Sequence, residues 1–346
     1  MNLDALNKIA IGMVAQGKGI LAADESSGTI KKRFDSIKVE STADNRRDYR
    51  EMLFRTKDAM ENCISGVILY DETIRQNAKD GTPLVKLIEQ AGSIPGIKVD
   101  AGAKALAAFP GEQVTEGLDG LRERLAEYHQ LGARFAKWRA VIDIGREGNR
   151  AVPSYPCLRA NMHALARYAA LCQEAGIVPI VEPEVLMDGD HDIDRCFDVT
   201  QLTLNLLYEE LYFARVALEG SILKPNMVIS GKKCAKQASV SEIAEKTVKC
   251  FRRAVPAAVP GIVFLSGGQS DEEATANLNA MNAEYKQVMP WALSFSYGRA
   301  LQAAPLKAWG GKAENVAAGQ RAFAHRAKMN SLAQLGEWSD GLEKAA

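Results

Sequence analysis

The sequence predicts an α/β fold: a single closed barrel of eight parallel strands, ringed by helices, with extra helices at both ends of the chain. Eight short apolar segments, most of them separated by segments with helical periodicity, are typical of such a barrel. The length of 346 residues fits one barrel, and no linker or low-complexity segment divides the chain. We therefore expect one domain over residues 1–346, with the barrel at about 17–300 and a helical tail at about 301–346.

Each predicted strand is a short apolar run that ends at or near a polar or charged residue. The first strand has its apolar part before Asp24, and the second ends before Asp71 and Glu72. Pro225 has no N–H group, so it closes the sixth strand just after Lys224. In chain order we predict the strands at residues 17–26, 66–70, 97–100, 135–142, 177–184, 222–226, 261–266 and 291–296.

Helical periodicity fills most of the intervals between these strands. Between residues 118 and 131, for example, apolar side chains recur at three- and four-residue steps, which places them on one helical face. Ser239 with Glu242, and Ser270 with Glu273, are predicted capping boxes that begin two further helices. The other predicted helices cover residues 3–14, 43–62, 118–131, 158–175, 197–218 and 314–335.

The composition narrows the classes of partner. Lys and Arg total 43, as do Asp and Glu, so the net charge of zero gives no overall field to attract nucleic acid or an anionic membrane. The sequence contains no apolar run of about 18 residues, and its first residues lack the basic start and apolar core of a signal peptide. We expect a cytoplasmic protein with neither a nucleic-acid nor a membrane partner.

The cysteines, histidines and glycines predict no metal or cofactor site. None of the six cysteines belongs to a CxxC pair, so we expect free thiols in a reducing compartment. The four histidines are far apart and have no metal-ligand spacing. The segment 17–19 (GKG) precedes its strand and does not match the dinucleotide-binding pattern GxGxxG.

Lys224 stands at the end of an apolar strand and is the strongest single candidate for chemistry. Burial disfavours the charged form of a lysine, and a neutral lysine amine is a nucleophile that forms a Schiff base with a carbonyl substrate. Taken alone, the same pattern also fits a surface lysine that reaches into solvent. The other strand ends are needed to choose between these two interpretations.

Polar and charged residues stand at the ends of most other predicted strands. In a parallel barrel the active site lies at the carboxyl ends of the strands, so these residues should meet at one mouth. Charges arriving from five strands are hard to explain as packing, because strand interiors should be apolar. The predicted mouth residues are Asp24, Lys98, Lys137, Arg139, Glu182, Glu184, Lys224, Ser266, Gly267, Gly268, Ser296, Gly298 and Arg299.

Two of these patterns suit phosphate groups. The segment 266–268 (SGG) offers backbone N–H groups that can approach an anion closely, and Arg299 can make a bidentate phosphate contact. Both follow the last two strands, where such barrels often bind phosphate. Lys98 and Lys137 with Arg139 could hold a second anion across the mouth. A small molecule with two phosphates would fit this arrangement.

Glu182 and Glu184 flank Pro183, so in an extended chain both would point into the mouth. Imine formation needs a proton donor that expels water and a base that takes the proton back. A carboxyl near like charge and apolar walls has a raised pKa, which suits that role. We therefore expect a raised pKa in this pair, and Lys137 close to Lys224.

Together these segments resemble the class I fructose-1,6-bisphosphate aldolases, the metal-free Schiff-base type. The matching segments follow the family's order along nearly the whole chain: GILAADES at 19–26, FAKWR at 135–139, PIVEPE at 179–184, LKPNMV at 223–228, FLSGGQS at 264–270, FSYGRAL at 295–301 and LKAWGGK at 306–312. The resemblance implies reversible cleavage of fructose 1,6-bisphosphate to dihydroxyacetone phosphate and glyceraldehyde 3-phosphate, in glycolysis and gluconeogenesis. It also implies a cytoplasmic homotetramer, with a phosphosugar substrate and without cofactors.

The resemblance also assigns roles to the mouth residues. Lys224 matches the imine-forming lysine, and Glu182 matches the general acid/base of imine formation, with Glu184 in support. Asp24 matches the residue that handles the C4 hydroxyl proton, and Lys137 matches the lysine that assists cleavage. The 1-phosphate end would be Ser266, Gly267, Gly298 and Arg299, and the 6-phosphate end and rim would be Ser26, Thr29, Arg33, Lys98 and Arg139.

The chain departs from the family's pattern at three points. Thr29 stands where well-known members have serine, which keeps the hydroxyl, and Ala101 stands where a lysine is common. Animal enzymes end in a mobile tail whose terminal tyrosine is implicated in proton exchange at C3 of the enamine. This chain has no tyrosine after Tyr297, so either another group or water would perform that step, or the step would be slower here.

Other functions compete with an aldolase. A transaldolase-like transferase would also use a lysine imine, but one phosphate cluster would suffice for its monophosphate donor. A non-catalytic assembly protein would use the outer surface and would have no reason to keep Lys224, Glu182 and Asp24 together. A metal-dependent aldolase would need clustered histidines. The residues leave open the oligomeric state and the preference among fructose bisphosphate, fructose 1-phosphate and sedoheptulose bisphosphate.

Overall fold

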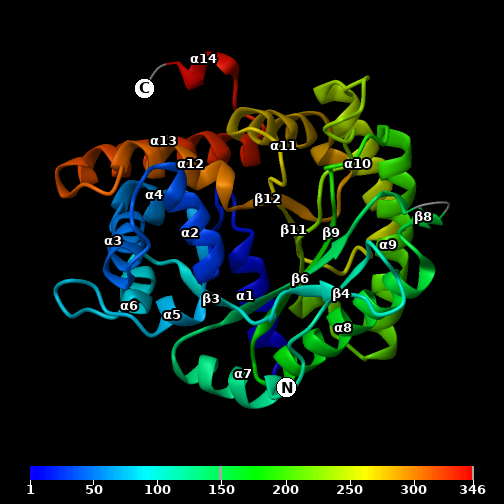
Figure 1. Cartoon of the computed structure of the whole chain (residues 1–346), viewed down its shortest axis with the longest axis horizontal. Helices are drawn as coiled ribbons and strands as arrows, with labels where there is room; N and C mark the ends of the chain where they lie inside the picture. Colours follow the sequence, from blue (N-terminus) through cyan, green and yellow to red (C-terminus); the bar gives the residue numbers. More distant parts are fainter. Residues whose placement is uncertain (148–149, 345–346) are drawn as a thin grey trace.

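The computed structural model describes residues 1–147 and 150–344, and it confirms the predicted barrel of eight parallel strands (Figure 1). The barrel strands are β1 (Gly19–Ala23), β2 (Ile64–Leu69), β3 (Ile94–Lys98), β6 (Phe135–Ile142), β9 (Val178–Val185), β10 (Ile222–Leu223), β11 (Gly261–Phe264) and β12 (Ala292–Tyr297). They follow one another around the barrel in sequence order, and β12 pairs with β1 to close it. This is the (β/α)8, or TIM, barrel.

Helices surround the barrel and lie at both ends of the chain (Figure 1). They are α1 (Leu3–Met13), α2 (Ser27–Ser36), α3 (Ala43–Phe54), α4 (Lys57–Asn62), α5 (Asp71–Ile74), α6 (Leu84–Gln90), α7 (Leu121–Gln130), α8 (Tyr155–Glu174), α9 (Ile193–Phe213), α10 (Val240–Ala254), α11 (Asp271–Tyr285), α12 (Arg299–Trp309), α13 (Val316–Leu335) and α14 (Asp340–Glu343). Two short hairpins, β4 (Ala103–Ala105) with β5 (Gln113–Thr115) and β7 (Gly145–Glu147) with β8 (Arg150–Val152), lie outside the barrel sheet. No helix among the described residues is long and apolar enough to cross a membrane.

The first helix fills one end of the barrel. Leu6 and Met13 of α1 belong to the same buried cluster as the interior side chains Ile20, Phe135 and Val263. The residue after α1, Val14, lies against Gly261, which is the first residue of β11, so α1 packs at the amino ends of the strands. The carboxyl ends are left open, and this is where the sequence places its charged residues.

The third strand begins earlier than the predicted residue 97, because Pro95 and Gly96 belong to it instead of preceding it as a turn. Both residues lie within β3 and pair with Val67 and Ile68 of β2. Gly96 is needed for close packing, because a Cβ there would lie 2.3 Å from the ring of Phe135. A glycine that makes room inside a sheet has the same sequence signature as a glycine in a turn.

Several helix predictions were also incomplete. The segment predicted as one helix at 43–62 is two, α3 and α4, and the helices α2 and α12 were not predicted. The last two residues of the predicted tail lie outside the described residues. Ser270 and Glu273 form the predicted capping box, whereas the Ser239 side chain accepts the Glu242 N–H without the reciprocal contact. The sixth strand stops at Leu223, although the Lys224 N–H still donates to the Val181 carbonyl at 2.8 Å.

Candidate active site

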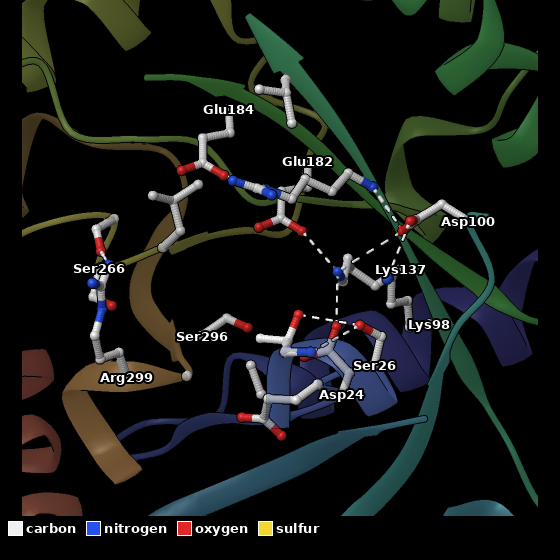
Figure 2. Close-up of a pocket in the computed structure, with 18 of the residues that line it drawn as sticks. Asp24, Ser26, Lys98, Asp100, Lys137, Glu182, Glu184, Ser266, Ser296 and Arg299 are labelled. Carbon is white, nitrogen blue, oxygen red and sulfur yellow. Dashed lines mark hydrogen bonds and ion pairs between the residues drawn. The ribbon is translucent and has the colours of Figure 1, made fainter. Parts of the chain in front are cut away.

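A cavity of about 590 Å³ opens at the carboxyl ends of the strands (Figure 2). Successive residues of a strand point to opposite faces, so every second residue of β6 and β9 reaches it. The cavity is lined by Lys137 and Arg139 of β6 and by Glu182 and Glu184 of β9. Their neighbours Trp138 and Val181 point the other way and pack into the outer core. The other predicted site residues that line it are Asp24, Ser26, Thr29, Arg33, Lys98, Lys224, Ser266, Gly267, Gly298 and Arg299.

Lys137 is at the centre of a buried group of carboxylates. Its Nζ lies 2.8 Å from Asp24 Oδ2, 3.3 Å from Glu182 Oε2 and 4.0 Å from Asp100 Oδ2. The Lys137 side chain is only 5% exposed, so these ion pairs are poorly screened by water. Strands β1, β6 and β9 therefore converge on one ammonium group (Figure 2).

Lys224 lies on the other side of Glu182. The Lys224 Nζ is 3.2 Å from Glu182 Oε1, and both side chains are at least 95% buried. Lys224 therefore does not reach into solvent, which rules out the surface interpretation of this lysine. Glu182 bridges Lys224 and Lys137, so the two lysines lie near each other as predicted, although the bridging carboxylate was not predicted.

The electrostatics of this group favour the charged forms of Asp24 and Lys137. Burial raises the pKa of Asp24, but the nearby charges of Lys137 and Lys224 outweigh it and hold that pKa well below its usual range. Burial alone lowers the pKa of Lys137, but Asp24, Glu182 and Asp100 raise it well above that of a free lysine. Each charge is stabilised by partners of opposite sign.

The expectation of a raised pKa was wrong for Glu182. Burial raises the pKa of this carboxyl, but Lys137, Lys224 and Arg139 together bring it below its ordinary value. The sequence pattern indicates the apolar walls and the second carboxylate, but not that three cations converge on Glu182, two from β6 and one from the residue after β10. Glu184, the second carboxylate, accepts a hydrogen bond from Arg139 Nε instead of facing Glu182 alone.

One end of the cavity is built on the start of α2. The Ser26 hydroxyl caps this helix: it accepts the Thr29 N–H at 3.4 Å and lies 3.1 Å from the Thr29 hydroxyl. The amino end of a helix carries a partial positive charge that favours anions. Arg33, one turn further along α2, donates to Glu25 Oε1 at 2.5 Å. Lys98 lies 3.4 Å from Asp100 on the same side of the cavity.

The opposite end is built on the turn after β11 and the start of α12. Ser266 is buried at the mouth, and Gly267 follows with a positive φ of 56°. Gly298 precedes α12, and Arg299, its first residue, donates from Nη2 to the Gly267 carbonyl. The structure thus brings the predicted phosphate residues to two ends of one cavity, except Gly268, which was expected at the mouth but does not line the cavity.

Two residues of the site, Asp100 and Glu25, were not among the predicted mouth residues, and a third, Ser296, was predicted there without a role. Asp100 contacts Lys98 and Lys137, and its carboxylate accepts the Arg139 N–H at 3.3 Å. Glu25 accepts hydrogen bonds from Arg33 and, at 2.7 Å, from Gln302 of α12. Glu25 directly follows Asp24, and Asp100 lies two residues after Lys98. Their position at predicted strand ends was therefore the signal that could have identified them. The buried Ser296 hydroxyl faces the cavity without a hydrogen-bond partner among the described residues.

The described residues contain no group of three or more His, Cys, Asp or Glu side chains arranged to hold a metal ion. The charges of the cavity are instead compensated by ion pairs between its own side chains. The arrangement offers a buried amine, an adjacent carboxylate, a second buried cation and two basic ends. Such a set can form an imine, move protons beside it and hold a doubly anionic substrate.

Comparisons with known proteins give the family. The family model described as "Fructose-bisphosphate aldolase class-I" matches residues 5–346. The chain is 58% identical over 339 residues to a probable fructose-bisphosphate aldolase class 1 of Xanthomonas campestris, covering 98% of this chain and 99% of that protein. It is 56% identical over 322 residues to a protein of Arabidopsis thaliana named "Fructose-bisphosphate aldolase 6, cytosolic", covering 93% and 88%.

A solved structure extends the likeness to three dimensions. The fructose-bisphosphate aldolase of Plasmodium falciparum, solved with TRAP and a small-molecule inhibitor, superimposes with a TM-score of 0.94. The two chains are 48% identical, and the match covers 98% of this chain and 96% of the other. These matches span the cavity and every strand that supplies it, and the chain belongs to the class I fructose-bisphosphate aldolase family.

Proposed function

We propose that this protein cleaves fructose 1,6-bisphosphate reversibly into dihydroxyacetone phosphate and glyceraldehyde 3-phosphate, through a Schiff base on Lys224. The observation that carries the proposal is the buried contact of 3.2 Å between the Lys224 amine and the Glu182 carboxylate, inside a cavity with two basic ends. Family membership supports the same reaction and its place in glycolysis and gluconeogenesis.

Imine formation begins with a proton transfer within this pair. When Lys224 gives a proton to Glu182, the amine becomes a nucleophile and the carboxyl becomes an acid at hydrogen-bond distance. The amine adds to the C2 carbonyl, and Glu182 then protonates the departing hydroxyl, so that water leaves and a protonated imine remains. Lys137 stays charged throughout and compensates the carboxylate each time it re-forms.

Cleavage of the C3–C4 bond uses Asp24 and Lys137, which lie on the opposite side of Glu182 from Lys224. Asp24 takes the proton of the C4 hydroxyl, the C3–C4 bond breaks, and its electron pair moves into the protonated imine to give an enamine. The low pKa of Asp24 keeps it ionised and ready to accept a proton at neutral pH. The Lys137 ammonium, 2.8 Å from Asp24, stabilises charge that develops on the C4 oxygen.

The two basic ends of the cavity are proposed to hold the phosphates. Ser266, Gly267, Gly298 and Arg299 would bind the 1-phosphate near Lys224. Ser26, Thr29, Arg33, Lys98 and Arg139 would bind the 6-phosphate at the amino end of α2. Support comes from the position of both groups on the lining of one cavity. Glu184 would orient Arg139 through their hydrogen bond.

We further propose a single catalytic domain over the whole chain, acting as a cytoplasmic homotetramer without a cofactor, a membrane partner or a nucleic-acid partner. The exposed aromatic residues Tyr212 and Phe213 at the end of α9 are 77% and 67% exposed, which supports contact with another subunit. The cytosolic relative in Arabidopsis thaliana supports the location.

The buried Tyr297 hydroxyl donates to the Ala274 carbonyl at 2.9 Å, so this tyrosine does not supply the C3 proton exchange.

The test is a coupled assay of fructose 1,6-bisphosphate cleavage in EDTA. Wild type should cleave the substrate, and Lys224→Met should lose more than about 10⁴-fold in kcat because the variant lacks the proposed imine-forming amine. Lys236→Met, at an exposed lysine of the same loop region, is the matched control and should retain wild-type kcat. Folded wild-type protein that does not cleave the bisphosphate would overturn the proposal. Transfer of a three-carbon unit without release of dihydroxyacetone phosphate would favour the transaldolase-like reaction.

A further inference from the structure

The turn between β11 and α11 has fixed ends and a glycine pair at its centre. The Ser266 carbonyl accepts hydrogen bonds from both the backbone N–H and the side-chain amide of Gln269, each at 3.1 Å. Gly267 has φ of 56°, and Gly268 lies outside the left-handed range. A positive φ at the first central residue alone is typical of a type II′ turn.

The peptide unit between these two glycines is held from opposite sides. Its carbonyl, on Gly267, accepts a hydrogen bond from Arg299. Its N–H, on Gly268, donates to the thioether sulfur of Met187 at 2.8 Å. Gly267 and Arg299 line the large cavity, whereas Gly268 and Met187 do not. The carbonyl therefore lies on the cavity side, and the N–H points behind the turn.

This orientation is the wrong one for binding an anion. A carbonyl oxygen repels a phosphate and here also occupies Arg299, while the N–H that could bind the phosphate is turned away. Rotating the central peptide by about half a turn converts a type II′ turn into a type I′ turn, which needs positive φ at both central residues. Both residues are glycine, so neither conformation strains a side chain.

We propose that the Gly267–Gly268 peptide flips when the phosphate end of the substrate binds, and that Met187 sets the phosphate affinity by competing for the Gly268 N–H. The flip frees Arg299 from the Gly267 carbonyl and turns the Gly268 N–H toward the phosphate. This inference rests on the proposed function only in placing a phosphate beside Ser266 and Arg299. Met187 acts as a positioning residue, because its sulfur contacts the turn and not the substrate.

The surroundings of Met187 suit a reversible contact. Its backbone is fixed, since its carbonyl accepts the Lys232 N–H at 2.7 Å and the neighbouring Asp188 pairs with the Lys232 ammonium at 2.9 Å. Its side chain, however, is flexible, and a thioether is a weak hydrogen-bond acceptor. A phosphate oxygen is a much stronger acceptor and can displace it. Met187 therefore stabilises the free form of the turn without locking it.

Two substitutions with opposite expected effects test this competition. Met187→Leu keeps the bulk but removes the acceptor, so it should lower the dissociation constant of inorganic phosphate by about fivefold. Met187→Gln supplies a stronger acceptor and should raise that constant by about fivefold. In both variants the KM for the bisphosphate should change in the same direction while kcat stays near wild type. Binding is measured by titration calorimetry with inorganic phosphate.

Controls separate the turn from other effects. Met289→Leu, at a partly buried methionine before β12 and so at the opposite end of the barrel, should leave the affinity unchanged. Arg33→Ala alters the basic end of the cavity at α2, away from the glycine turn. In that background Met187→Leu should still lower the dissociation constant of phosphate. Gly268→Ala disfavours positive φ and must also displace the Lys232 side chain, whose Cε lies 1.8 Å from the position of the added Cβ. In this variant Met187→Leu should no longer improve the affinity. Thermal unfolding of each variant confirms that it is folded.

The outcomes distinguish this inference from the proposed function. Weaker phosphate binding in both Met187→Leu and Met187→Gln would show that Met187 only supports the turn, and would overturn the inference. Unchanged affinity in both variants, or no phosphate binding by wild type at millimolar concentration, would also overturn it. Because the titration needs no turnover, failure to cleave fructose 1,6-bisphosphate would overturn the proposed function and leave this result standing.

Discussion

The centre of the cavity and its rim hold their charges in different ways. At the centre, Lys137 and Lys224 pair with carboxylates that belong to the proposed reaction itself. The side chains of Lys137, Lys224 and Glu182 are buried, and that of Asp24 is only 13% exposed. At the rim, the cations pair with groups that exchange no proton with the substrate in the proposed mechanism. These rim pairs are Arg33 with Glu25, Arg139 with Glu184, and Arg299 with the Gly267 carbonyl.

The difference indicates two kinds of preparation for a substrate. The charged side chains at the centre are already paired with the groups that the reaction needs. They therefore have to reorganise little during catalysis. At the rim, the Gly267 carbonyl and the carboxylates occupy the arginines, so phosphate binding must exchange one acceptor for another. Substitutions at the centre should therefore act mainly on kcat, and substitutions at the rim mainly on KM.

The largest effect is expected at the centre, from Lys137→Met. The substitution leaves Asp24, Glu182 and Asp100 without their shared buried cation, so kcat should fall by at least about 100-fold. Breaking a buried ion pair from one side should also lower the free energy of unfolding by about 3–5 kcal/mol. Steady-state kinetics and urea unfolding measure both. A kcat near that of wild type would show that the central charges are structural, and the comparison would fail.

A smaller effect, of a different kind, is expected at the rim from Arg299→Ala. Loss of a charged phosphate contact should raise KM by about 10- to 100-fold, with a lesser effect on kcat. Arg321→Ala, at an exposed position of α13, is the matched control and should leave both parameters unchanged. If kcat fell as far as KM rose, the rim would share the catalytic role of the centre, and the distinction would be lost.

The smallest effect is one of pH on stability. Asp24 has a lower pKa in the folded protein than in the unfolded chain, so its ion pair stabilises the fold above the unfolded value of about 4. That contribution is lost as the pH falls below about 4, where the unfolded state binds the proton first. The stability difference between wild type and Asp24→Asn should therefore be constant near neutral pH and shrink on acidification. Urea unfolding at pH 3, 4, 5 and 7 measures it, and a difference that grows toward pH 3 would contradict the assigned ion pair.

The same comparison explains what could be predicted from the sequence. Strand-end residues such as Lys137, Glu182 and Lys224 were found because alternation along a strand and the polarity of a parallel barrel fix where they point. The opposite shift of the Glu182 pKa was not found, because it depends on distances to cations on other strands. Local pattern determines which residues face the cavity, whereas their pairing is set by packing between strands.

The rim was predicted less completely for a related reason. Its geometry depends on α2 and α12, whose short sequences are polar or interrupted, with Pro305 inside α12. Partners such as Glu25 and Gln302 come from distant segments and carry no spacing signal. The contact of Met187 with Gly268 likewise joins residues 81 positions apart. Sequence patterns identify the phosphate-binding turn but not the group that holds it.

The central claim, that Lys224 is the nucleophile, is tested most directly by trapping its imine. The protein is incubated with dihydroxyacetone phosphate in EDTA, reduced with borohydride and digested, and the modified peptide is located by mass spectrometry. We predict one adduct, on Lys224, that is absent from Lys224→Met. An adduct on Lys137 or Lys98 would keep the chemistry but contradict the assigned nucleophile. No adduct on folded protein that also fails to cleave the bisphosphate would contradict the aldolase function.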